Sequence, residues 1–192
     1  MRLVVPLRPR SIERALAAAS AASPTFDDAA HEGEEPSRYA HDRVEGVVGH
    51  GVGDFAAARS GLSIWAAHEM PGLGVFPPSV PLAEGVTCLV TFGTRLLALV
   101  APCRVTRVLD EERRFGFTYA TLPGHPEEGE ESFVIEMDVL DDVRFTIEAR
   151  SRPAGALGRA TAPIGRRVQH RVAAGYLRSL EQHVARSARD VR

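Results

Sequence analysis

The chain contains no lysine and no asparagine, and all 23 of its basic residues are arginine. We attribute this composition to GC-rich codon usage, which indicates a high-GC bacterium, before any functional choice of arginine. The formal net charge is −2. Because there is no basic excess, we do not expect binding to nucleic acid through neutralisation of phosphates.

Long hydrophobic runs are also missing. The longest strongly apolar run, Leu96–Ala101, is far shorter than the ~20 residues that cross a bilayer. Residues 1–7 contain Pro6 and lack the apolar region of a signal peptide. The two cysteines, Cys88 and Cys103, fit a reducing compartment. We therefore expect a cytoplasmic protein with two buried free thiols, and a disulfide between them is the less favoured alternative.

Familiar catalytic motifs are absent as well: there is no nucleophile elbow, Cys-x-x-Cys pair, Walker loop or His-Glu-x-x-His motif. The segment GHGVGD at 49–54 approaches the dinucleotide-binding pattern, but Asp54 stands where that pattern requires glycine. A carboxylate there occupies the donors at a helix N-terminus and repels phosphate. We interpret the segment as a glycine turn followed by an N-cap at Asp54.

Composition and length indicate one soluble globular unit. Hydrophobic residues make up 44% of the chain and charged residues 25%, which is ordinary for a globular domain. We predict a single domain over 1–192 in which the polar, acidic segment 27–43 forms a surface loop. Helices are predicted at 12–22 and after Asp54, with Trp65 as a core anchor on the apolar face of the second.

From residue 86 the hydrophobic period changes to two, which is typical of strands. A short strand at 44–48 is followed by predicted strands at 86–92, 96–109, 115–122, 131–139 and 143–151. Their short connections favour antiparallel neighbours. A long helix is predicted from Pro163, and its apolar stripe comprises Val168, Val172, Tyr176, Leu180 and Val184. The predicted fold class is α+β, a curved antiparallel sheet packed around the long C-terminal helix.

The most polar segment of the sheet region is GHPEEGE at 124–130, predicted as a turn. His125 stands there beside four glutamates, Glu127, Glu128, Glu130 and Glu131. One imidazole is too few for a typical transition-metal site, so no metal is expected. His125 with Glu130 or Glu131 could act as acid and base, because a histidine there would titrate near neutrality. An exposed, solvated acidic loop is the commoner explanation of such a pattern.

Three arginines, Arg104, Arg150 and Arg152, lie on or near strands that end close to this segment. We expect one of them to pair with Glu130 or Glu131. An arginine left unpaired inside a cavity would instead bind a carboxylate of a ligand.

Tyr119 and Thr121 stand on the apolar-facing row of their strand and are the best candidates for polar groups inside a pocket. The alternative for Tyr119 is a core position in which its hydroxyl reaches a backbone carbonyl.

Several segments together resemble a known family. They are VVGHGVGDFAAA with the following LSIW, PCRV, RFGFTYATLPGHPEEGEESF, VRFTIEARSRP and VQHRVAAGYLRSL. On these segments the chain is similar to uncharacterised protein family 0548, also called domain of unknown function nineteen-ninety, of bacteria and plants. The resemblance extends from the first helix to about Val184. Two positions depart from the expected pattern, Ala120 in place of glycine and Phe26 in place of tyrosine.

The resemblance implies no particular activity. It implies a relative of the helix-grip, or START-like, fold, which includes carriers of apolar ligands, cyclases, hydratases and regulatory modules.

Three hypotheses for function remain open. The first is binding of a small apolar molecule between the sheet and the C-terminal helix. The predicted lining residues are Phe117, Tyr119, Phe133, Phe145 and Tyr176, with His125, Glu130 or Arg152 at a polar rim. The second is an acid–base enzyme, of the cyclase, hydratase or hydrolase type, that uses His125 and a nearby glutamate. The third is a cavity-free interaction module whose partner surface is the 27–43 loop. No cofactor is predicted, and the ligand and the oligomeric state stay open.

Overall fold

The computed structural model describes the backbone of residues 4–5, 8–26, 39–94 and 98–190, and within these ranges the side chains of all residues except 4–5, 9, 156–170 and 190. The strands are β1 (Val4–Val5), β2 (Ala40–His50), β3 (Leu73–Phe76), β4 (Thr87–Gly93), β5 (Ala98–Asp110), β6 (Arg114–Thr121), β7 (Glu127–Met137) and β8 (Asp142–Pro153). The helices are α1 (Pro9–Ser20), α2 (Gly51–Ser63), the short 3₁₀ helix η3 (Ala66–His68) and α3 (Gly155–Asp190).

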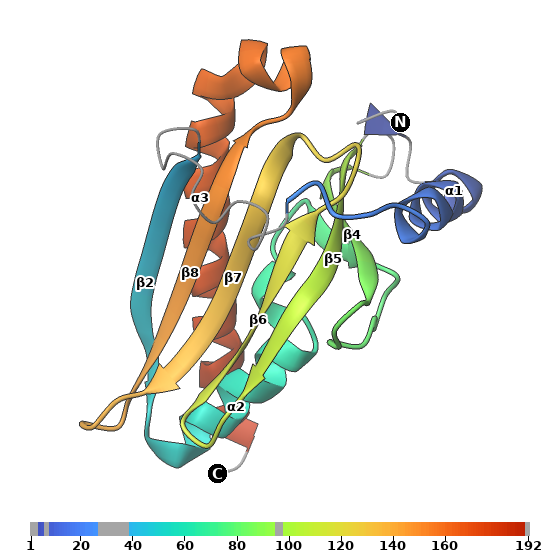
Figure 1. The fold of residues 1–192 in the computed structure, drawn as a ribbon. Helices are drawn as coiled ribbons and strands as arrows, with labels where there is room; N and C mark the ends of the chain where they lie inside the picture. Colours follow the sequence, from blue (N-terminus) through green and yellow to red (C-terminus); the bar gives the residue numbers. More distant parts are fainter. Residues whose placement is uncertain (1–3, 6–7, 27–38, 95–97, 191–192) are drawn as a thin grey trace.

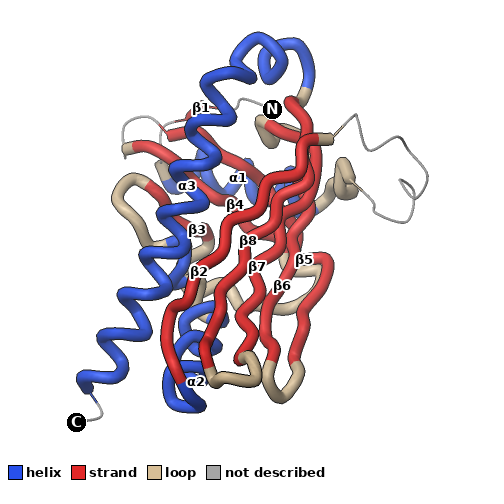
Figure 2. Tube along the Cα trace, turned by 90° about the vertical axis from the view of Figure 1, so that its left-hand side faces the viewer, coloured by secondary structure: helices blue, strands red, loops and turns tan. Residues whose placement is uncertain are grey.

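The strands form one antiparallel sheet in the order β2-β8-β7-β6-β5-β4-β3, and β1 pairs with β5. Strands β3 to β8 follow one another as a meander, while β2 closes the far edge against β8. Register shifts at Val47/Gly49 and Val105/Arg107 mark bulges, which bend and twist the strands that carry them. The sheet curls, and α3 runs along its concave face (Figures 1 and 2). The predicted fold class is therefore confirmed.

Alternation along the strands separates the two faces of the sheet. On β8 every second residue from Val143 to Ser151 is buried, whereas the residues between them are partly exposed. Outward-facing charges pair across strands, as between Arg114 Nε and Glu136 at 3.1 Å. Such exposed pairs add little stability, so the free energy of folding comes mainly from the inward row.

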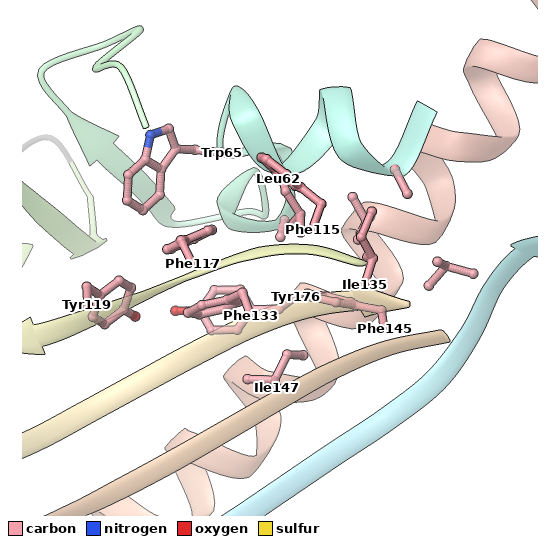
Figure 3. Packing of buried hydrophobic residues seen from close by; sticks show 14 of the residues in the cluster. Leu62, Trp65, Phe115, Phe117, Tyr119, Phe133, Ile135, Phe145, Ile147 and Tyr176 are labelled. Atoms are coloured by element: carbon pink, nitrogen blue, oxygen red, sulfur yellow. The ribbon is translucent and has the colours of Figure 1, made fainter. Parts of the chain in front are cut away.

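Two elements cover the concave face. Helix α2 packs Phe55 and Leu62 against the sheet, and α3 packs Tyr176 and Leu180. Trp65 follows α2 in a left-handed conformation (φ 62°), and its indole N–H donates to the carbonyl of Val80 at 3.0 Å. Figure 3 shows Leu62, Trp65 and Tyr176 beside the aromatic row of the sheet. The prediction of Trp65 as a core anchor is confirmed.

Helix α1 lies on the opposite, convex face, against β4 and β5. Ile12 and Ala19 pack there on Leu89 and Val100. Arg104 points outward from β5, and its Nη2 donates to the carbonyl oxygens of Ala19 at 3.2 Å and Ser20 at 3.0 Å. Arg104 therefore caps the C-terminus of α1 and is not part of a pocket.

The boundaries of two helices differ from the predicted ones. Helix α2 begins at Gly51, so Asp54 lies in its first turn, not at the N-cap, and its carboxylate accepts from the backbone N–H of His50 at 2.9 Å. Helix α3 begins at Gly155, so Pro163 lies inside it. No helix in the described part of the chain is long and apolar enough to cross a membrane.

Two predicted loops are partly strand. Residues 40–43 of the predicted 27–43 loop belong to β2, and 27–38 lie outside the described residues. Strand β7 begins at Glu127, so most of the predicted acidic turn is also strand. In both cases cross-strand pairing with β8 overrides the polar composition.

We expect Phe133→Ala to lower the free energy of unfolding by about 3–5 kcal/mol, because removing a buried ring leaves a cavity. Phe133 is 0% exposed and stacks on Phe117 with ring centroids 4.9 Å apart. Urea unfolding followed by circular dichroism measures the loss. The control Val139→Ala, at a position that is 96% exposed, should change stability by less than about 0.5 kcal/mol. Equal losses in the two variants would contradict the assignment of the core.

Candidate functional site

A cavity of about 330 Å³ lies between the concave face of the sheet and α3. Its apolar lining residues are Leu73, Val90, Phe92, Leu99, Ala101, Pro126, Ala149 and Val172. Its polar lining residues are Tyr119, Thr121, His125, Glu127, Glu130, Glu131, Ser151 and Tyr176.

The position of this cavity follows from the length of the covering elements. Helix α2 and η3 pack beneath one half of the sheet, next to residues such as Phe115 and Phe117. The other half, where β6 ends and β7 begins, is faced by α3 and β3. The cavity occupies this second half, in the upper part of the molecule as drawn in Figure 1.

Glu131 is the central ionisable group of the cavity. It shares the inward row of β7 with Phe133, and the hydroxyl of Tyr119 on the neighbouring strand donates to its Oε2. The pKa of Glu131 is raised to about 7, mainly by burial; the hydrogen bond from Tyr119 lowers this pKa in part, and the nearby Glu127 contributes to the rise. Glu131 is therefore poised between its protonated and ionised forms near neutral pH.

Two tyrosines extend this polar cluster from β6 to α3. Figure 3 shows the hydroxyl groups of Tyr119 and Tyr176 pointing toward one another. Burial raises the pKa of both hydroxyls well above their usual value, and the charge of Glu131 adds to this rise. Both tyrosines are therefore neutral hydrogen-bonding groups at physiological pH. The prediction of Tyr119 as a polar group inside a pocket is supported by its place in the lining.

The remaining polar groups are tied to the ends of the strands. Ser151 donates to Glu127 Oε2 at 2.6 Å. Thr121 Oγ1 accepts from the backbone N–H of Gly129 at 3.0 Å and lies 2.5 Å from Thr25 Oγ1. These bonds fix the point at which β6, β7 and β8 meet.

Burial moves the pKa of His125 away from the neutral range that the sequence suggested, and its role as an acid or base stays a prediction. Its Nδ1 accepts from the backbone N–H of Glu127 at 3.0 Å, which holds the ring in the turn. Burial lowers the pKa of His125 to about 4. The imidazole therefore stays neutral at neutral pH, although it does line the cavity beside Glu130 and Glu131.

The ion pair between an arginine and Glu130 or Glu131 stays a prediction, and Arg150 lies directly opposite Glu130 in the register of β7 and β8. Arg152 Nε donates to Glu128 Oε2 at 2.9 Å, and its guanidinium lies 4.8 Å from the centre of the Tyr39 ring. Arg152 is thus on the outer face with Glu128 and is not among the lining residues of the cavity. The strand period explains this, because even-numbered residues of β8 point away from α3.

Phe117, Phe133 and Phe145, which were predicted to line the pocket, form packed core instead. Their rings stack in sequence, with centroids 4.9 Å and 6.4 Å apart, and none of the three is among the lining residues. Tyr119 and Tyr176 of the predicted set do line the cavity.

One buried polar residue was not anticipated from the sequence. His68, in η3, is 1% exposed, and neither of its ring nitrogens has a hydrogen-bond partner among the residues that the structure describes. Its ring lies 4.5 Å from that of Tyr176 and 5.0 Å from that of Phe133. Burial lowers the pKa of His68 to about 3. No sequence pattern marks this position, because its burial depends on where η3 meets α3.

The two cysteines lie directly opposite one another on β4 and β5 as free, buried thiols. Burial raises the pKa of Cys88 to about 12 and that of Cys103 well above its usual value. Both are therefore protonated and unreactive at neutral pH. Within the described ranges, no group of three His, Cys, Asp or Glu residues could hold a metal ion.

We expect His68 to make the fold sensitive to acid. Its pKa is lowered to about 3 in the folded protein, so stability present above pH ~6.5 is lost as the pH falls toward 3. His68→Phe should remove this loss and raise the free energy of unfolding by roughly 1–3 kcal/mol at pH 5, because it also removes unsatisfied polar atoms. Urea unfolding at pH 5 and pH 7.5 measures both effects. A pH dependence unchanged in His68→Phe, or changed equally in the control His41→Gln on β2, would contradict this.

We expect Glu131 to make the protein less stable as the pH rises, the reverse of the pH dependence expected from His68. Its pKa is raised to about 7, so stability present below pH ~4.5 is lost as the pH rises through 7. Glu131→Gln should therefore stabilise the protein by roughly 1–3 kcal/mol at pH 8 and hardly at all at pH 4.5. Thermal unfolding at the two pH values tests this. The control Glu128→Gln, which breaks the outer pair with Arg152, should give no gain at pH 8, and a gain there would count against the burial argument.

The fold and sequence both have known relatives. The crystal structure of the hypothetical protein jhp0584 from Helicobacter pylori superposes with a TM-score of 0.56 at 12% identity, covering 84% of this chain and 96% of that chain. At this identity the likeness shows the fold alone. It agrees with the helix-grip architecture of a curled sheet around a terminal helix.

Two curated relatives are similar in sequence. A UPF0548 protein of Deinococcus radiodurans is 42% identical over 77 residues, which is 40% of this chain and 39% of that relative. The UPF0548 protein At2g17695 of Arabidopsis thaliana is 31% identical over 121 residues, which is 59% of this chain and 57% of that relative. This chain thus covers between about two fifths and three fifths of their lengths. Because one relative is from a plant, the similarity does not support a bacterial source in particular.

The family described as Domain of unknown function (DUF1990) matches residues 24–179. The match includes strands β2 to β8, α2 and the cavity-lining part of α3. The chain therefore belongs to the DUF1990 family, which has the helix-grip fold here.

Proposed function

We propose that the protein binds a small, mainly apolar molecule in the cavity between the sheet and α3. The observation that carries this proposal is the shape and chemistry of the cavity, about 330 Å³ with apolar walls and one polar end. At ~30 Å³ for each water-sized group, it accommodates about ten non-hydrogen atoms. Sites for small ligands in proteins typically combine such apolar walls with a few convergent polar groups.

The contrast with the neighbouring core supports this proposal. Beneath Phe133 the inward face is closed by packed aromatic rings. Beyond Glu131 it carries hydrogen-bonding groups, and polar groups facing an interior space are expensive unless something solvates or binds them. The cavity also argues against the cavity-free interaction module.

Native mass spectrometry of the purified protein, followed by denaturing extraction, tests whether a small molecule accompanies it. Titration calorimetry with 1-naphthylmethanol, a neutral apolar probe of suitable size, tests the cavity directly.

The variant Val172→Trp should abolish binding of this probe, since Val172 lines the cavity from α3. The control Arg178→Trp alters an exposed position on the same helix and should retain binding. Retained affinity in Val172→Trp would contradict the proposed site, as would failure of the wild-type protein to bind any apolar probe.

A second candidate function is acid–base catalysis on a bound apolar substrate. Glu131, hydrogen-bonded to Tyr119, has the pKa of about 7 that suits a general acid or base near neutrality. It takes the role that the sequence suggested for His125. A screen for cyclase, hydratase and hydrolase reactions tests this function. An activity that survives in Glu131→Gln would exclude Glu131 as the acid or base.

A further inference from the structure

The polar end of the cavity restricts the chemistry of its occupant. We propose that the ligand carries a protonated amine, whose ammonium group pairs with the Glu131 carboxylate while its apolar body fills the rest of the cavity. This inference rests on the proposed binding function and names the ligand class for that site.

The charges around Glu131 favour a cationic ligand. The ionisable groups that influence Glu131 are Tyr119 on β6, Tyr176 on α3, Cys103 on β5 and Glu127 on β7. All of them are neutral or negative at neutral pH. Among the side chains that the structure describes, none with a positive charge lines the cavity, and the lining histidine is neutral. From the described side chains, an ionised Glu131 therefore receives no counter-charge, and a cationic ligand would supply one.

The hydrogen bonds of the cavity carboxylates also favour a ligand that donates. Tyr119 donates to Oε2 of Glu131, whereas Oε1 receives no donor from the described residues. Glu127 accepts from Ser151. An ammonium group brings up to three N–H donors and no acceptor, so it can donate to Oε1 of Glu131.

The apolar walls of the cavity indicate that the body of the ligand, apart from its ammonium group, is apolar. Val90, Ala101 and Val172 line the cavity away from the carboxylates and offer no hydrogen bonds through their side chains. A polycation would lose solvation against these walls without compensation. A carboxylate ligand would meet Glu127 and Glu131 with no cation between them. One ammonium group on an apolar body satisfies both regions.

The pKa of Glu131, raised to about 7 by burial, adds a measurable linkage. Pairing with an ammonium group favours the ionised carboxylate. Binding near neutral pH should therefore release a proton, and affinity should fall as the pH drops below about 7.

Three probes with the same aromatic body test the proposal: 1-naphthylmethylamine, 1-naphthylmethanol and 1-naphthoic acid. Titration calorimetry at pH 8 should show the amine binding roughly tenfold to a hundredfold more tightly than the alcohol, as expected for a hydrogen bond to a charged group, and the acid binding most weakly. Glu131→Gln should abolish the preference for the amine, and the control Glu128→Gln should retain it.

A second measurement does not depend on a variant that folds. Calorimetry of the wild-type protein with the amine at pH 6.5, in two buffers of different ionisation enthalpy, should show proton release. The role of Glu131 would be overturned if binding of the amine released no proton, or if binding of the alcohol released a proton as well.

Other outcomes separate the two proposals. If the alcohol binds as tightly as the amine and Val172→Trp blocks it, the cavity binds ligands but the amine inference is wrong. It is also wrong if Glu131→Gln keeps the preference, or if a molecule extracted from the purified protein has no basic nitrogen. If none of the three probes binds and no molecule is extracted, the binding function fails and the amine inference fails with it.

Discussion

The structure depends on covering one apolar face of a curled antiparallel sheet. Such a face must be removed from water, and here α2 with η3 covers one half while α3 runs along the sheet. The left-handed turn at Trp65 and its hydrogen bond to Val80 close the first cover. Because α2 and η3 end beneath the aromatic rows, the remaining half is faced, among the described elements, by α3 and β3. The cavity lies where α2 and η3 do not cover the sheet.

The alternation of side chains along β7 places two carboxyl groups, those of Glu131 and Glu127, in the cavity. The inward row of β7 runs from Met137 through Ile135 and Phe133 to Glu131 and Glu127 without changing face. The row therefore passes from packed core to cavity along a single strand. Burial of a carboxyl group placed in this way raises its pKa, and the hydrogen bond from Tyr119 offsets only part of that rise. Because its carboxyl group is buried, ionised Glu131 lowers the stability of the fold, and its raised pKa suits it to binding or proton transfer.

Much of the fold could be predicted from local patterns. The alternation at 115–122 and 143–151 and the helical spacing of Tyr176, Leu180 and Val184 identified the right elements and faces. The site was predicted less well. Phe133 and Phe145 share the inward face with Tyr119, but only the covering by α2 and α3 separates packed rings from cavity lining. The glutamates of 127–130 were taken as a turn because composition alone does not reveal pairing with β8.

Local patterns in the sequence suffice for the class of fold, since the hydrophobic period and the short connections fix which residues face inward and which strands are neighbours. They also indicate Tyr119 and Glu131 as candidates. Long-range packing was needed to show that His125 is neutral, that Arg152 lies outside the cavity, and that His68 is buried with no hydrogen-bond partner among the described residues. The reason is that burial and pKa depend on elements distant in the chain, which local spacing does not encode.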